Sequence, residues 1–245
     1  MAARNGIRDT SILLAVAILL FVFQVLYSAE VSSIFFTLLI IGLIISPVVY
    51  PISRFPVEFD ARRLSDILWG LGGFAVYIVL LTPAVILIKG SGASAAQSIV
   101  GYIQATTPIL AGSTIVTLIV FGILGPITES VVIFGRIYEF IGTTAKVAID
   151  RITLRSVLLA TFIAAGFTFL HLQARVLVAE AAIFDNVAII STFLFGAISM
   201  AIIFYRSSKG IRELSPIIWM HVFANISAIL IKMGNPFAQA IFGLA

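Results

Sequence analysis

The chain has 245 residues, of which 61% are hydrophobic and only 11% are charged, whereas soluble domains carry about 25% charged residues. This composition excludes an ordinary soluble domain, and the absence of cysteine excludes disulfides, thiolate nucleophiles and cysteine-ligated metal centres. The formal net charge of +4 indicates no nucleic-acid partner, because the basic residues fall in short segments between apolar runs, where they set membrane topology. An integral membrane protein is therefore predicted.

Seven stretches are apolar enough to cross a bilayer as helices, for which about 20 residues suffice. They are Ser11–Tyr27, Val31–Tyr50, Ile67–Ile88, Ser113–Phe140, Arg155–Val178, Val187–Tyr205 and Ser215–Ile231. Helices are expected because an open strand edge would leave backbone groups unsatisfied in lipid. Two further stretches, Ser94–Leu110 and Asn235–Ala245, are predicted to lie at the membrane surface. The expected fold class is all-α, a polytopic transmembrane helix bundle of about seven spans, with residues 1–245 as a single domain.

The basic residues are distributed unequally between the two sides of these spans. If the N-terminus is inside, the inner segments hold 11 basic residues and the outer ones 3, with Arg136 left aside. The inner ones are Arg4, Arg8, Arg54, Arg62, Arg63, Lys146, Arg151, Arg155, Arg206, Lys209 and Arg212, and the outer ones are Lys89, Arg175 and Lys232. An excess of Lys and Arg marks the cytoplasmic side. We therefore expect a multi-pass protein with a cytoplasmic N-terminus and a C-terminus outside.

The fourth span, Ser113–Phe140, carries ionisable residues at membrane depth. It is predicted to break at Gly125-Pro126, and Glu129 and Arg136 follow in apolar sequence. An ionisable group inside a membrane is costly and marks a functional site by default. Arg136 lies seven residues after Glu129, so both can face one side of a helix. The alternative is an internal ion pair that fixes the break.

Both histidines of the chain lie in other apolar spans, each with a recognisable neighbour. His171 ends the run that begins at Phe167, and His221 precedes Asn225 by four residues on one helix face. A carboxylate such as Glu129 can act as general base, one imidazole can hold the water, and the other imidazole and an amide can donate hydrogen bonds to an oxyanion. A lone histidine in a membrane helix more often serves as a hydrogen-bonding group between helices.

These motifs resemble those of the CPBP family of intramembrane glutamate-type proteases, which includes the CAAX prenyl endopeptidases. That family carries EExxxR, FxxxH and HxxxN motifs on separate helices. Phe167–His171 matches the second motif and His221–Asn225 matches the third, so that the similarity covers about residues 113–231, the protease-like core.

The first motif is only partly matched. Glu129 fits its first glutamate, but Ser130 stands in the place of the second, and Arg136 comes two residues later than the arginine of the motif. This departure leaves a second interpretation open, in which the chain is a non-catalytic CPBP-like membrane subunit that acts as a scaffold in a multi-subunit membrane complex.

The resemblance implies an intramembrane endopeptidase that hydrolyses a peptide bond of a membrane-associated protein. Glu129 and His171 would activate the water, and His221 and Asn225 would form the oxyanion hole. Supporting roles would fall to Arg136, Ser130 and Phe167. The implied partners are the lipid bilayer, a membrane-associated peptide or protein substrate and, for a scaffold, other membrane subunits.

A metal site is a further alternative, because Glu129, His171 and His221 are zinc-ligand types. No HExxH helix accompanies them, so we expect neither a metal nor any other cofactor. A small transporter would fit a broken fourth helix, but no inverted repeat is visible. The two histidines are expected at different depths, which is a difficulty for a shared site. His171 lies about 16 residues into its span and His221 about six, which corresponds to about 24 Å and about 9 Å of helix rise.

Overall fold

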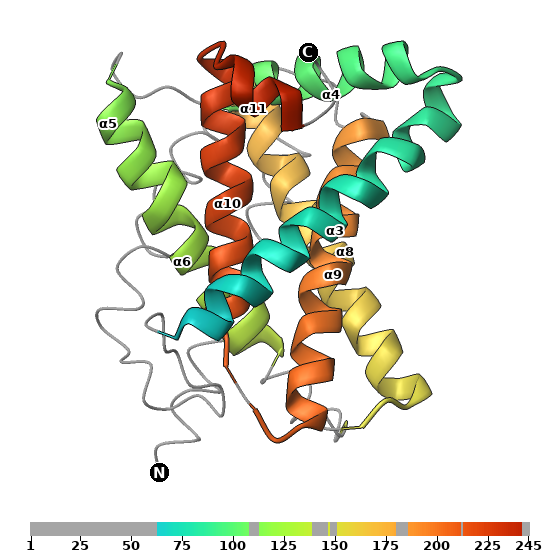
Figure 1. Ribbon diagram of the computed structural model, residues 1–245. Helices are drawn as coiled ribbons and strands as arrows, with labels where there is room; N and C mark the ends of the chain where they lie inside the picture. The colour runs from blue at the N-terminus through green and yellow to red at the C-terminus, as the bar shows by residue number, and fades with distance from the viewer. Residues whose placement is uncertain are drawn as a thin grey trace.

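The computed structural model describes residues 63–107, 113–138, 147, 151–179, 186–211 and 213–241, most of which form helices (Figure 1). The helices are α3 (Leu64–Lys89), α4 (Gly92–Thr106), a composite helix of α5 (Thr114–Thr117), η3 (Leu118–Leu124), α6 (Gly125–Glu129) and η4 (Ser130–Ile137), then α8 (Leu154–Ala179), α9 (Asn186–Ser208), α10 (Ser215–Lys232) and α11 (Pro236–Ile241). Within these ranges no β-strand occurs. The predicted all-α class is confirmed for this part of the chain.

Three of the described helices, α3, α9 and α10, are long and apolar enough to cross a membrane. They correspond to the third, sixth and seventh predicted spans. Shorter apolar stretches, Thr114–Ile127 and Leu154–Phe169, occupy the fourth and fifth. The first two predicted spans lie outside the described residues. The structure therefore indicates a membrane protein with at least these three candidate spans.

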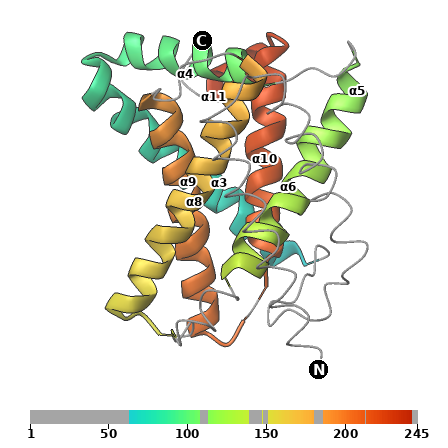
Figure 2. The same cartoon turned by 180° about the vertical axis from the view of Figure 1, so that it is seen from behind.

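Helix α10 occupies the centre of this arrangement. It contacts α3 and α4 as well as η3 and α6 of the composite helix, while α8 packs on α9 (Figures 1 and 2). Helix α4, which overlaps the predicted surface segment Ser94–Leu110, lies across one end of the bundle. The Lys232 Nζ donates to the backbone oxygen of Gln104 and joins the end of α10 to α4.

The fourth span is not broken at Gly125-Pro126, contrary to prediction. The helix continues through Pro126 because the preceding turns are π-helical, with the Gly125 N–H bonded to the Val120 oxygen five residues back. This wider turn relieves the clash that a proline ring makes with the carbonyl four residues before it. A Cβ at Gly125 would lie only 3.3 Å from that same Val120 oxygen, which favours glycine here.

Small residues allow the central helices to approach closely. A Cβ at Gly70 of α3 would lie 2.5 Å from the Trp219 Cβ and 2.8 Å from the Met220 nitrogen of α10. A Cβ at Gly196 of α9 would similarly lie 2.9 Å from the Ala164 Cα of α8. Membrane helices associate through such close packing, because lipid supplies no hydrophobic driving force between them.

Replacement of Gly70 by alanine is therefore expected to destabilise the protein. The added methyl meets the backbone of α10, and such overpacking costs about 1–3 kcal/mol, partly offset by the roughly 1 kcal/mol that alanine gains over glycine in a helix. The matched control is Gly72→Ala, two residues along α3, where a Cβ meets nothing within 4 Å. Thermal unfolding in detergent checks this, and equal midpoints for the two variants would contradict it.

Candidate active site

Glu129, His171 and His221 meet at one point although they come from three separate helices. Glu129 ends α6, His171 lies on α8 and His221 lies on α10. The Glu129 Oε2 is 3.3 Å from the His171 Nε2 and 3.6 Å from the His221 Nε2. The difference in depth expected from the sequence does not separate the two histidines, because their rings lie 6.4 Å apart between centroids. These three predicted site residues are therefore brought together.

The orientation of His171 is set by its own helix. Its Nδ1 lies 3.0 Å from the Phe167 backbone oxygen, one turn earlier on α8. A carbonyl oxygen only accepts, so Nδ1 carries the hydrogen, and the Nε2 of the neutral ring turns its lone pair toward Glu129. Two acceptors thus face each other at 3.3 Å. A shared proton or a donor such as water satisfies both of them.

One oxygen of the Glu129 carboxylate, Oε2, lies between the two imidazoles without a well-formed hydrogen bond to either. It is buried and accepts no hydrogen bond from the other described residues. Buried acceptors normally have a partner, and exceptions call for an explanation such as an ordered water or a catalytic role. The side chains of Glu129 and His171 are each 30% exposed, whereas that of His221 is 4% exposed. The cluster is therefore partly exposed at Glu129 and His171 and buried at His221.

Aromatic rings surround the two histidines and hold them in place. The Phe167 ring lies 4.1 Å from the His171 ring and 5.8 Å from the His221 ring, and it is 2% exposed. Phe134 packs on Phe167 at 5.3 Å, and Phe195 lies 4.9 Å from the His221 ring. The predicted supporting role of Phe167 is thus one of packing. Phe134 and Phe195 were missed, since phenylalanine in a membrane helix carries no motif signal.

Ser130 contacts His221 rather than standing unused beside Glu129. Its Oγ lies 3.4 Å from the His221 Nδ1, and the serine is fully buried. A hydroxyl can donate to Nδ1 or accept from it. When it donates, the hydrogen of the neutral His221 ring is on Nε2, which faces Glu129. Ser130 therefore bears directly on the tautomer of His221.

Asn225 is engaged in a different contact from the one predicted. Its Nδ2 donates to the Phe121 backbone oxygen at 2.8 Å. In the π-helical pattern that oxygen would accept from residue 126, which is a proline and has no N–H. The N–H of Gly125 is already bonded to the Val120 oxygen. Asn225 thus satisfies a carbonyl that Pro126 leaves without a main-chain donor, and one N–H of its amide remains for other partners.

The three clustered residues also form a set that could hold a metal ion. Their ligand atoms lie within 4.8 Å of one another, and two imidazoles with a carboxylate are a common zinc donor set. The carbonyl bonded to the His171 Nδ1 is the kind of outer contact that orients metal-bound histidines. The same geometry suits a water held between acceptors, so chelation is the experiment that separates the two.

The side chains of Arg136 and Arg175 lie outside the described part of the structure. The predicted pairing of Arg136 with Glu129 therefore stays a prediction, and only the backbone of Arg136, in η4, is placed.

No family model, curated protein or solved structure matches this chain.

Proposed function

We propose that this protein is a multi-pass intramembrane endopeptidase of the CPBP type, in which Glu129 and His171 activate a water that hydrolyses a peptide bond of a membrane-associated protein. The observation that carries the proposal is the convergence of three helices on one carboxylate, with Glu129 Oε2 3.3 Å and 3.6 Å from the two imidazole Nε2 atoms. His171 and His221 come 42 and 92 residues after Glu129 in the chain, and all three meet at this point. An ionisable group at membrane depth marks a functional site.

The chemistry follows from the acceptors that face each other. A water between the Glu129 Oε2 and the His171 Nε2 donates to either atom, and Glu129 takes its proton as the oxygen attacks the carbonyl carbon. The tetrahedral intermediate bears an oxyanion, which collapses as the C–N bond breaks, and the proton held by Glu129 passes to the leaving amine. The products are a new carboxylate and a new amine. Partial exclusion of water strengthens every electrostatic contact in such a site.

The oxyanion is assigned to His221 first. In the proposed tautomer the Ser130 hydroxyl donates to the His221 Nδ1, so that Nε2 carries the hydrogen and its N–H points into the cluster. Asn225 keeps one amide hydrogen for the same task, while its other hydrogen is bonded to Phe121. A hydrogen bond aimed at a developing oxyanion contributes about 2.7–4 kcal/mol in comparable sites.

Ser130→Ala is expected to lower kcat by about 10-fold or more, because loss of the hydroxyl lets His221 adopt the other tautomer, in which Nε2 only accepts. Peptide cleavage kinetics measure this effect. The matched control is Ser191→Ala, a buried serine of α9 whose hydroxyl contacts Tyr77 instead of the site. A Ser130→Ala enzyme with wild-type kcat would show that the serine only packs.

The topology proposed for this function has about seven spans with the N-terminus in the cytoplasm. Its support is the excess of basic residues in alternate loops, 11 against 3, together with the three described helices that can span a membrane. The chain has no cysteine, so single cysteines placed in each loop and labelled by an impermeant maleimide read the topology directly.

The experiment that tests the function uses purified protein in proteoliposomes. Fluorophore–quencher peptides of one sequence are presented free in solution or attached to the membrane by a prenyl or acyl anchor. The proposal predicts cleavage of anchored peptides and little cleavage of free ones, because the site lies within the membrane-spanning part. A panel that stays intact in every format would overturn the proposal.

Cleavage is further expected to survive metal removal. Because Glu129 and His171 provide the acceptors for the water, treatment with EDTA or 1,10-phenanthroline should leave kcat within about twofold of the untreated value, well below the 10²–10⁴-fold that loss of a general base causes. Elemental analysis of the purified protein accompanies the assay. Loss of activity on chelation, regained with Zn²⁺, would instead assign Glu129, His171 and His221 as metal ligands.

A second candidate is the non-catalytic scaffold, and two contacts favour it. Asn225 bonds to the Phe121 oxygen and the His171 Nδ1 bonds to the Phe167 oxygen, so two of the motif side chains make internal packing contacts. This candidate predicts that the native protein is isolated in a stoichiometric membrane complex and that Glu129→Gln leaves the complex and its cellular role intact. A stable monomer that cleaves peptides would exclude it.

A further inference from the structure

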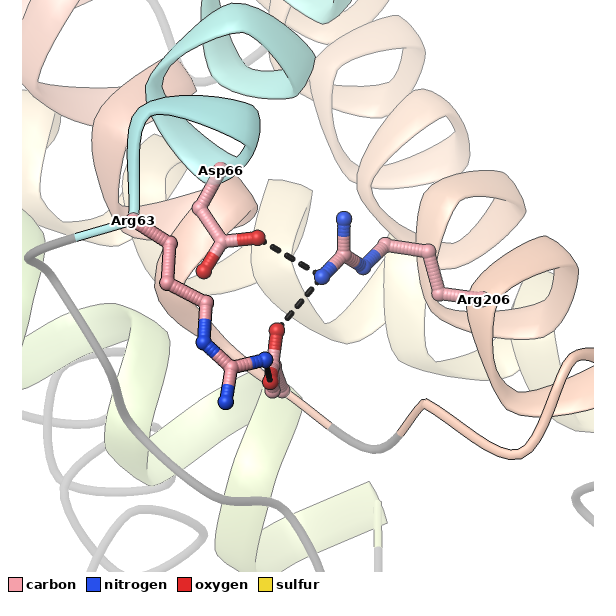
Figure 3. Close-up of polar contacts among 4 residues, drawn as sticks. Arg63, Asp66 and Arg206 are labelled. Atoms are coloured by element: carbon pink, nitrogen blue, oxygen red, sulfur yellow. Dashed lines mark hydrogen bonds and ion pairs between the residues drawn. The ribbon is translucent and has the colours of Figure 1, made fainter.

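A buried cluster of charges lies away from the candidate active site, where α3 begins, α9 ends and α10 begins (Figure 3). The cluster consists of the buried residues Asp66, Arg206 and Glu213 and of Arg63, whose side chain is exposed at its edge. One nitrogen of Arg206, Nη2, donates to the Asp66 Oδ1 at 2.6 Å and to the Glu213 Oε2 at 2.5 Å. The other oxygen of Glu213 accepts from the Arg63 Nη1 at 2.7 Å. The Asp66, Arg206 and Glu213 side chains are at most 6% exposed.

Stability alone does not account for this cluster. A buried ion pair commonly adds little net stability over apolar side chains of the same size, because removing charges from water costs as much as their attraction returns. Here the pairing is also incomplete, since the Asp66 Oδ2 and the Arg206 Nε are buried without hydrogen-bond partners among the described residues. The best-attested use of such groups is to fix one packing arrangement among several of similar energy.

The helices joined by the cluster need such a device. Lipid supplies no hydrophobic driving force between membrane helices, so polar contacts add to close packing in fixing how they meet. Glu213 lies two residues before α10, and Leu214, Ser215 and Pro216, which follow it, are all buried. Pro216 stands in the first turn of α10, where its fixed φ suits a helix start. A carboxylate held at both oxygens therefore fixes where α10 begins.

The start of α10 controls the position of His221. The helix is continuous from Ser215 to Lys232, and His221 comes six residues after its first residue, about 9 Å along the axis. A rotation of α10 by one residue turns a side chain by about 100°, which removes the Nε2 from the 3.6 Å contact with Glu129. A displacement of about 1 Å in a catalytic group can cost about 100-fold in rate.

We propose that Asp66, Arg206 and Glu213 are positioning residues that set the rotation and depth of α10 and thereby hold His221 against Glu129. For its kinetic readout this inference rests on the proposed peptidase function. Its structural readout, the position of α10, does not.

The main test is the triple variant Asp66→Leu/Arg206→Met/Glu213→Met, which replaces every buried charge of the set by an apolar side chain. The melting temperature should stay at or above that of the wild type, while kcat falls about 10- to 100-fold with KM nearly unchanged. Single Arg206→Met should instead lower the melting temperature, because it leaves Asp66 buried without a cation and Glu213 paired with Arg63 alone. Lys209→Met, an exposed basic residue in the turn after α9, is the matched control and should match the wild type.

The position of α10 is measured by spin labels at Ile123→Cys on η3 and Met233→Cys at the end of α10. Both side chains are exposed, and no native cysteine competes for the label. The inter-label distance distribution should shift or broaden in the triple variant but not with Lys209→Met. Glu213→Gln keeps the shape of the side chain and removes one charge, so it should change the distance distribution in the same way. This variant takes the place of the triple variant if the triple variant fails to fold.

The proposal would be overturned if the triple variant showed wild-type kcat and an unchanged distance distribution. If the triple variant does not fold, an unchanged distribution in Glu213→Gln would overturn it. If the wild-type protein cleaves no peptide, the proposed function fails, and the distance distributions alone then decide the positioning role.

Discussion

Glu129→Gln is expected to reduce peptide cleavage by about 10²–10⁴-fold, the contribution of a positioned general base. The amide has the size of the carboxylate and can still lie between His171 and His221, but it cannot take a proton from water. The Glu129 Oε2 is buried but makes no well-formed hydrogen bond that the substitution would break. The fold should therefore be retained. Initial rates in proteoliposomes and thermal unfolding of the same preparations measure both parts.

Two comparisons make this result specific. Glu58→Gln makes the same chemical change at a carboxylate that the sequence places in the loop between the second and third predicted spans, and it should cleave like the wild type. The double variant Glu129→Gln/His171→Gln should be hardly slower than either single variant, since residues that act on one water do not contribute additively. Cleavage by Glu129→Gln at the wild-type rate would exclude Glu129 as the base.

Asn225→Leu is expected to destabilise the protein by about 1–3 kcal/mol, because the Phe121 oxygen then remains without a donor. The physical cause lies in Pro126, which lacks the N–H that the π-helical turn would otherwise offer to that oxygen. Pro126→Ala supplies this N–H. It should therefore recover stability in the Asn225→Leu background by more than it changes stability in the wild-type background, with a coupling energy of about 0.5 kcal/mol or more.

The measurement is a double-mutant cycle of unfolding free energies in one detergent, with cleavage rates recorded beside it. The stabilised Asn225→Leu/Pro126→Ala protein still lacks the Asn225 amide. Any loss of kcat that remains in it therefore measures the contribution of Asn225 to holding the oxyanion. Additive effects of the two substitutions would contradict the link between Asn225, Phe121 and Pro126.

Much of the helix arrangement was predictable from the sequence, because apolar length in a membrane protein leaves little choice of secondary structure. Boundaries of the predicted spans at Ile67, Val187 and Ser215 fall within a few residues of the observed starts of α3, α9 and α10. The continuity of the fourth span was not predictable. Gly-Pro normally ends a helix, and only the π-helical turn before Gly125 lets the chain continue.

The sequence predicted which residues form the candidate site, but it did not predict the contacts that they make. Rare polar residues in apolar spans identified Glu129, His171 and His221, since each is costly at membrane depth. The sequence could not show that Asn225 is bonded to Phe121, because that contact arises from a carbonyl freed by a backbone irregularity. It likewise gave no sign that Asp66 and Glu213 share Arg206, as side chains 140 and 7 residues away meet only in the folded bundle.

The measurement that tests the central claim most directly is cleavage of a membrane-anchored peptide in H2(18)O by the purified wild-type protein, with the products weighed by mass spectrometry. Activation of water by Glu129 and His171 predicts one 18O atom in the new C-terminal carboxylate, in the presence of chelator, and no product from Glu129→Gln. An intact peptide after prolonged incubation, or labelled product formed equally by the Glu129→Gln protein, would contradict it.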